Sequence, residues 1–141
     1  MYIDSAYLAK FYLNEPDSAP VRQAIAAAAT RVTSAWAMAE VTCTFHRKVR
    51  EGMIDGSHCS QLIDAFGEDV ETEVWMLIPI TQRILLRLTA ALKSLPDRAF
   101  VRAGDALHLT TAMDTGEREI WSNDRHLLAA APYFGLIGRS A

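Results

Sequence analysis

The chain has 141 residues, of which half are hydrophobic, and this composition excludes a disordered protein. Its apolar runs are too short to span a membrane, and Asp4 interrupts any secretory signal core, so we expect a cytoplasmic protein with no membrane partner. The formal net charge of −3 argues at first against a polyanionic partner, and two cysteines are too few for a disulfide framework.

Strand and helix patterns alternate along the whole sequence. In chain order, we expect a strand at 1–3, helices at 5–14 and 19–29, a strand at 31–35 and a long helix at 36–51. A polar helix at 55–73 follows, either continuous or broken at Gly67. The strand at 74–80 is the clearest candidate for a buried strand. Helices at 81–95 and 102–116, a strand at 119–122, a short helix at 124–131 and an edge strand at 134–138 complete the chain.

This alternation predicts a three-layer α/β/α fold with a mainly parallel central sheet. No linker, internal repeat or low-complexity segment interrupts it, so we expect one domain over residues 1–141. In a sheet of this kind, ligands bind beyond the carboxyl ends of the strands. Polar residues directly after a predicted strand are therefore candidates for a site.

Four carboxylates stand where an isolated charge would be costly. Asp4 directly follows the first strand, and Asp124 follows the strand at 119–122. Glu40 and Asp105 are each the only charge in an apolar or small-residue stretch of a helix. Burial of a lone carboxylate costs free energy or raises its pKa, so a buried group of them needs a positive partner. Each acid alone also has an ordinary structural interpretation, and for Asp124 a helix N-cap is an equally good one.

A group of carboxylates without suitably spaced cysteine or histidine favours Mg²⁺ or Mn²⁺. Such an ion activates water and stabilises the leaving oxygen in phosphodiester hydrolysis. If these four acids form one cluster, the rest of the molecule carries a net charge of +1, so nucleic acid is not excluded as a partner. His108 lies one turn after Asp105 and could face the same site, although we favour a hydrogen-bonded core residue. The basic run at 46–50 could bind a phosphate backbone, but cations that complement a helix C-terminus are the favoured interpretation.

Two other classes of function stay open on the residues alone. One is a Mg²⁺-dependent phosphatase with Asp4 as nucleophile, although Ala6 stands where such enzymes usually carry a second aspartate. The other is a non-catalytic module in which the acids receive a basic peptide. Trapping of a phosphoaspartate would identify the first class. A metal titration would identify the second, because a module that only binds a peptide should show no cleavage with Mn²⁺.

Four segments resemble, in order and spacing, the motifs of PIN-domain proteins, and most closely those of the VapC toxins of toxin–antitoxin pairs. They are "YIDSAYLAKFYLNEP" at 2–16, "TSAWAMAEVTCTFHR" at 33–47, "RAGDALHLTTA" at 102–112 and "WSNDRHLLAAA" at 121–131. The resemblance spans nearly the full chain. It implies a parallel sheet flanked by helices and the activity of a Mg²⁺- or Mn²⁺-dependent endoribonuclease.

The resemblance also assigns residues and partners. The catalytic, metal-holding acids of the family correspond here to Asp4, Glu40, Asp105 and Asp124. The supporting hydroxyls are Ser5, directly after the first acid, and Ser122, two residues before the last. The implied partners are an RNA substrate, a small VapB-like antitoxin whose tail enters the active-site groove, and a second copy of the chain in a homodimer.

Overall fold

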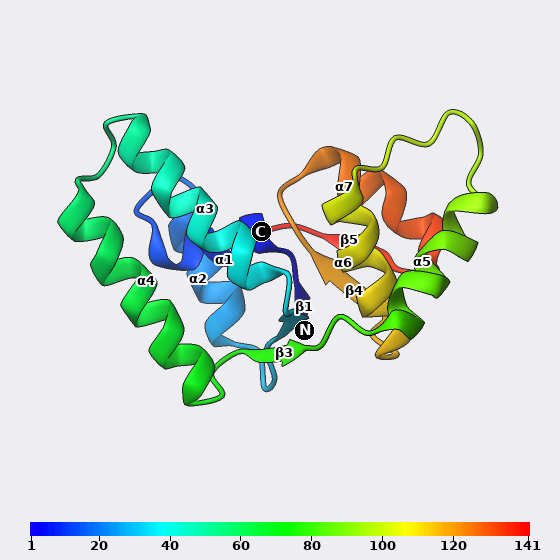
Figure 1. Ribbon diagram of the computed structural model, residues 1–141, viewed down its shortest axis with the longest axis horizontal. Coiled ribbons are helices and arrows are strands. Elements are labelled where there is room, and N and C mark those ends of the chain that lie inside the picture. The colour runs from blue at the N-terminus through cyan, green and yellow to red at the C-terminus, as the bar shows by residue number, and fades with distance from the viewer.

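The computed structural model describes residues 1–141 (Figure 1). The strands are β1 (Tyr2–Ile3), β2 (Val32–Ser34), β3 (Met76–Ile78), β4 (Glu119–Trp121) and β5 (Ile137–Arg139). The helices are α1 (Ser5–Tyr12), α2 (Ser18–Ala26), α3 (Ala37–Arg50), α4 (Gly56–Glu71), α5 (Gln82–Lys93), α6 (Ala103–Asp114) and α7 (Arg125–Ala130), followed by the 3₁₀ helix η1 (Ala131–Phe134). All strands are parallel, in the order β3-β2-β1-β4-β5, which confirms the predicted fold class.

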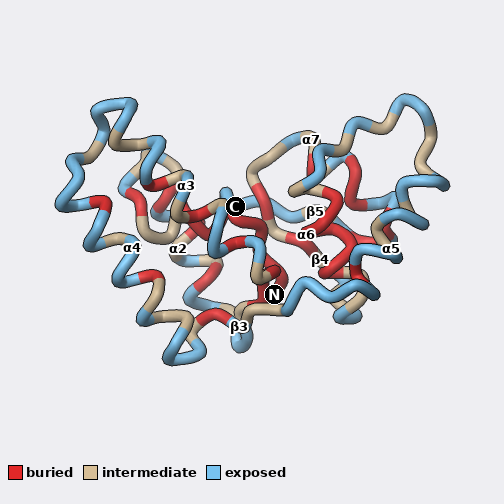
Figure 2. Tube along the Cα trace, in the orientation of Figure 1, coloured by how far each residue is buried: buried red, intermediate tan, exposed pale blue.

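The sheet separates two hydrophobic cores. Figure 1 shows α1 to α4 on one side of the strands and α5 to α7 on the other. Successive side chains of a strand point to opposite faces, so Ile3 packs into the first core with Phe45 and Trp75, whereas Tyr2 packs into the second with Leu109. Each fully buried side chain of this size contributes about 1.5–3 kcal/mol. Figure 2 shows the buried chain running along the centre, with α4 and α5 largely exposed.

The central strand β1 is the point at which the order of the strands in the sheet reverses. From β1 the sheet extends to β2 and β3 on one side, and to β4 and β5 on the other. Ile3 pairs with Trp121, and the N–H of Asp4 donates to the carbonyl of Trp121 at 3.1 Å. Asp4 therefore lies beside Ser122, and both are at the carboxyl ends of neighbouring strands. Such a switch point is where ligand crevices form in open α/β sheets.

The strand expected at 74–80 is shorter and more exposed than predicted. Only residues 76–78 form β3, and Met76 is 54% exposed. The reason is the strand order: β3 pairs with β2 alone and forms an edge of the sheet. The preceding Trp75 is the buried residue of this segment. The prediction of a strand in this segment is therefore correct, but its expected extent over 74–80 and its expected burial are wrong.

The structure decides between the two alternatives for one helix and shortens another. Residues 56–71 form one continuous helix through Gly67, so of the two alternatives for this segment the unbroken helix is correct. The last helix ends at Ala130 and continues as η1, in which Pro132 lies in the first turn, where its missing N–H is tolerated. None of the helices has the length and apolar character needed to cross a membrane.

Candidate functional site

A cavity of about 430 Å³ opens at the carboxyl ends of β1 and β4, and we call it the acid cavity. Its lining residues are Asp4, Ser5, Ala6, Glu40, Thr44, Arg47, Arg102, Gly104, Asp105, His108, Asp124 and Leu127. They come from α1, α3, α6 and α7 and from the residues just before α1, α6 and α7. All four acids predicted from the sequence, Asp4, Glu40, Asp105 and Asp124, therefore line one cavity.

Asp4 is the N-cap of α1 and is only 4% exposed. Its Oδ1 accepts a hydrogen bond from the N–H of Tyr7 at 2.7 Å, and its Oδ2 accepts one from the hydroxyl of Ser122 at 2.5 Å. Burial raises the pKa of Asp4 to about 6, even though the bond from Ser122 acts in the opposite direction. The Ser122 oxygen accepts in turn from the N–H of Asp124 at 2.8 Å, so this serine links two of the acids.

Glu40 is held by a buried histidine. His108 Nε2 lies 3.1 Å from Glu40 Oε2 and 2.8 Å from the hydroxyl of Ser5, while Nδ1 lies 3.1 Å from the hydroxyl of Tyr2. Burial raises the pKa of Glu40, but hydrogen bonds with His108 and Ser5 outweigh it and leave that pKa lowered. His108 is thus the hydrogen-bonded core residue that we favoured, and it also faces the site.

The other two acids share one guanidinium group. Arg102 donates from Nε to Asp105 Oδ2 at 2.8 Å and from Nη2 to Asp105 Oδ1 at 3.2 Å, and it also bonds to Asp124. Asp124 is the N-cap of α7, accepting from the N–H of His126 at 2.7 Å and of Leu127 at 3.3 Å. Burial raises the pKa of Asp124, but the bonds from His126 and Arg102 outweigh it and lower that pKa. The two carboxylates raise the pKa of Arg102.

Gly104 leaves room for the carboxylate of Glu40. A Cβ atom at position 104 would lie 2.5 Å from Oε1 of Glu40, well inside van der Waals contact. The absence of a side chain in the first turn of α6 therefore allows α3 to bring Glu40 against this helix. The sequence gives no sign of this role, because a glycine in the first turn of a helix is not unusual.

The fit of a divalent cation can be judged from the donor atoms. As the side chains lie, no group of three or more His, Cys, Asp or Glu residues is close enough to hold a metal ion. The hydrogen bonds explain this: Arg102 holds Asp105 and Asp124, and His108 holds Glu40. The four acids nevertheless offer only carboxylate oxygens, the donors that Mg²⁺ and Mn²⁺ prefer, so the chemistry of this donor set fits such an ion.

Of the two arginines that line the acid cavity, Arg102 was not singled out from the sequence, and Arg47 was considered only as part of the basic run at 46–50. Arg102 lies three residues before Asp105, a spacing that favours an ion pair on a helix and could have indicated it. Arg47 is the one member of the basic run at 46–50 that lines the cavity. Within that run, Lys48 pairs instead with Glu15 at 2.7 Å.

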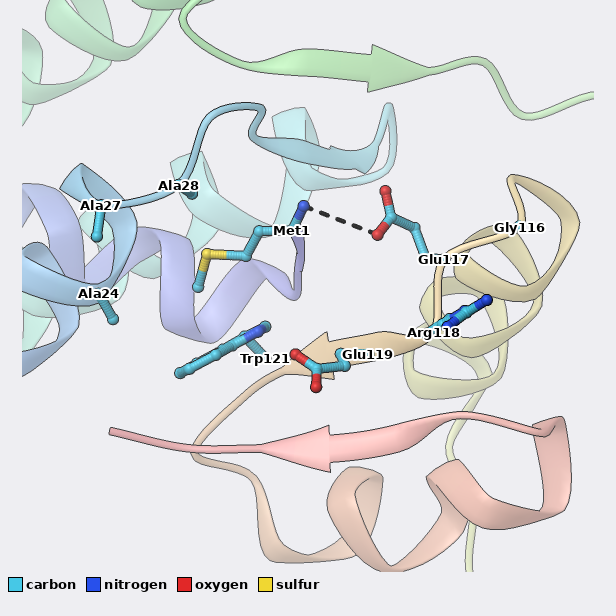
Figure 3. A pocket seen from close by; sticks show the side chains of 9 residues that line it. All are labelled: Met1, Ala24, Ala27, Ala28, Gly116, Glu117, Arg118, Glu119 and Trp121. Carbon is cyan, nitrogen blue, oxygen red and sulfur yellow. Dashed lines mark ion pairs between the residues drawn. The ribbon is translucent and has the colours of Figure 1, made fainter.

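A larger cavity, of about 730 Å³, lies at the opposite, amino ends of β1 and β4 (Figure 3). Its wall includes three alanines at the end of α2, the ring of Trp121, and an ion pair of 3.7 Å between the N-terminal amine of Met1 and Glu117. It contains none of the four acids. The carboxylates of the larger cavity are Glu117 and Glu119 instead, so the four acids predicted from the sequence all belong to the smaller cavity.

Comparison with known proteins agrees with the fold and with the sequence motifs. The family model described as "PIN domain" matches residues 1–132. No curated protein matches the chain. A match over so much of the sequence confirms the resemblance to PIN-domain proteins, and the chain belongs to the PIN-domain family, whose members are generally metal-dependent nucleases.

Proposed function

We propose that this protein is a Mg²⁺- or Mn²⁺-dependent endoribonuclease and the toxin of a VapC-type toxin–antitoxin pair. The observation that carries the proposal is the convergence of the four acids on one cavity. They are separated by up to 120 residues in sequence, yet the parallel strands and their helices bring them to the switch point of the sheet. Family membership supports a nuclease at the level of the reaction class.

Each acid has a role in this proposal. Asp4, Glu40 and Asp105 would hold the divalent cation, with Asp124 completing the site directly or through water. When bound, the cation supplies activation of water and stabilisation of the leaving oxygen. The hydroxyl of Ser122 orients Asp4, and that of Ser5 bonds to His108, which in turn holds Glu40. The two serines thus position the acids rather than react.

The proposed partners are those implied by the resemblance to VapC toxins, and the charge and apolar surface of the molecule are compatible with them. An acidic cavity suits a basic segment, which is the chemistry expected for the tail of a small VapB-like antitoxin acting in the cytoplasm. Helix α5 exposes leucines that nothing in the chain covers. A second copy of the chain would cover them, and we propose that the toxin is a homodimer.

The test is cleavage of a pool of structured RNAs by the purified protein, with Mg²⁺, Mn²⁺ or EDTA. We expect discrete products with either metal and none in EDTA. Asp4→Asn and Asp105→Asn should each lower the rate by about 100-fold or more, because each removes a charged ligand of the cation. Asp64→Asn, at an exposed position of α4 outside the cavity, is the matched control and should cleave normally.

Other outcomes point to the competing classes. A phosphoaspartate trapped at Asp4 would show that the protein is a phosphatase and not a nuclease. Ala6 already argues against a phosphatase, because such enzymes usually carry a second aspartate at this position. An absence of both cleavage and metal binding would indicate the non-catalytic peptide-binding module. Full metal-dependent cleavage by Asp4→Asn would show that the residue assignment is wrong.

A further inference from the structure

A second cavity, between α1 and α3, adjoins the acid cavity. This second cavity, which we call the α1–α3 cavity, has a volume of about 190 Å³. Its lining residues are Ala6, Ala9, Lys10, Leu13, Glu15, Thr44, Arg47 and Lys48. Three residues, Ala6, Thr44 and Arg47, line both cavities, so the two adjoin along the shared wall of α1 and α3.

One face of α3 connects the acids to this shared wall. Glu40, Thr44 and Arg47 are spaced by four and three residues, so they lie above one another on the same side of the helix. Along that side, a carboxylate in the acid cavity is followed by a hydroxyl and then by a guanidinium. At 1.5 Å per residue, the backbone of Arg47 lies about 10 Å along the helix axis from that of Glu40.

The charge of Arg47 is available to a ligand. Its side chain is 54% exposed, and its ion pair is a long one of 3.7 Å to Glu51, which is also exposed and is shared with Lys48. The two lysines of the α1–α3 cavity are committed to closer partners: Lys10 bonds to Asp17, and Lys48 bonds to Glu15 at 2.7 Å. An exposed ion pair is weak, so Arg47 can exchange Glu51 for a phosphate at little cost.

We infer that Arg47, with the hydroxyl of Thr44, binds a backbone phosphate of the RNA next to the cleaved one, and that the strand leaves the acid cavity through the α1–α3 cavity. This inference rests on the proposed function. In the proposed function the divalent cation serves the cleaved phosphate, so a neighbouring phosphate of the strand needs a separate cation at the rim of the cavity. A guanidinium matches the fork of phosphate oxygens, and a hydroxyl adds a further donor. Arg47 is a positioning residue in this account.

The experiment measures RNA binding apart from cleavage. In the Asp4→Asn background with Mg²⁺, the affinity for a fluorescently labelled RNA is followed by anisotropy over a range of NaCl concentrations. Arg47→Gln should weaken binding by roughly fivefold or more, and should reduce the slope of log K against log salt by about 0.7 to 1. Arg50→Gln removes the same charge from an exposed position of the same helix that lines neither cavity, and should change both quantities much less.

Cleavage kinetics provide a second readout. With Asp4 intact, Arg47→Gln should raise KM for RNA more than it lowers kcat, because a phosphate contact outside the reacting group is present in substrate and transition state alike. Thr44→Val should move KM in the same direction by a smaller factor. Circular dichroism melting of each variant checks that the fold is retained.

The outcomes separate this inference from the function on which it rests. If metal-dependent cleavage occurs but Arg47→Gln and Arg50→Gln weaken RNA binding equally, or neither does, the path along α1 and α3 is wrong and the nuclease stands. If the wild-type protein neither cleaves nor binds RNA, both are overturned. A selective loss for Arg47→Gln in affinity, salt slope and KM supports the path.

Discussion

At the scale of single residues, capping a helix and serving a site are compatible roles for a carboxylate. Asp4 and Asp124 each cap a helix through Oδ1, and each keeps Oδ2 for another partner. A carboxylate has about four lone-pair sites, so two backbone or hydroxyl donors do not exhaust it. The caps fix the position of each carboxylate, which a metal site requires. The structural interpretation of these two acids therefore does not compete with the functional one.

Because Gly104 has no side chain, substituting it with alanine should lower activity without lowering stability. In Gly104→Ala, the new Cβ displaces the carboxylate of Glu40, whose Oε1 would lie 2.5 Å away. We expect RNA cleavage to fall by roughly tenfold or more, as for a disturbed metal ligand. Folding should not suffer, because the displaced atom is the end of a flexible side chain and alanine favours the helix by about 0.5–1 kcal/mol.

The measurement is a cleavage assay paired with urea unfolding of the same preparation. Glu40→Gln, which keeps the shape of the side chain and removes its charge, shows how large the loss can be when Glu40 no longer serves as a ligand. If Gly104→Ala cleaves RNA as fast as the wild type, then Glu40 is not held against α6 during the reaction.

At the scale of helices and strands, a second Gly→Ala substitution, in α4 and outside the acid cavity, should change stability without changing activity. Gly67 lies inside this continuous helix, and a Cβ atom there would meet nothing within 4 Å. Gly67→Ala should raise the free energy of unfolding by about 0.5–1 kcal/mol, because alanine loses less backbone entropy in a helix. RNA cleavage should be unchanged. Urea unfolding monitored by circular dichroism measures the difference, and a loss of stability would mean that Gly67 makes a contact that the helix geometry does not provide.

The helices and strands could be predicted where a local sequence pattern determines them. The helical period and the apolar strands fixed the order of elements, and the parallel sheet then placed Asp4 and Asp124 at neighbouring strand ends. The strand at 74–80 was misjudged in burial because an apolar composition does not reveal which strand lies at the edge. That property depends on the strand order of the whole sheet.

The details of the site were less predictable, because they depend on contacts between distant segments. Arg102 bonds to Asp124 across 22 residues, and His108 to Glu40 across 68. The space beside Gly104 exists only because α3 and α6 meet there. Four of the five residues at 46–50 are basic, and only the orientation of α3 selects Arg47 among them for the cavity. The sequence predicted the types of residue in the site, but it did not predict which of these side chains contact one another.

At the scale of the whole molecule, helix α5 leaves an apolar surface that the rest of the chain does not cover. The sequence period of α5 is that of a helix with a buried apolar face, yet Ile84 is its only buried residue. Leu85, Leu86 and Leu92 are exposed, with Leu86 at 63%. Figure 2 shows α5 exposed along most of its length. Exposed apolar side chains grouped on one helix are typical of an interface with another chain.

The proposed homodimer can be tested at this helix. Leu86→Glu places a charge in the exposed leucine surface, and burial of that charge in an interface without a partner would cost several kcal/mol. We expect the wild type to sediment as a dimer and Leu86→Glu as a monomer at the same micromolar concentration. Gln61→Glu, which adds the same charge at an exposed position of α4, should stay dimeric.

The same pair of variants shows whether the dimer matters for the reaction. The four acids all come from one chain, so the cavity is complete without a partner and a folded monomer should still cleave RNA in the presence of Mn²⁺. If Leu86→Glu is monomeric and active, the exposed face of α5 serves assembly alone. If the wild type is already a monomer, the proposed homodimer is wrong, and the antitoxin becomes the first protein to test for binding to the leucines of α5.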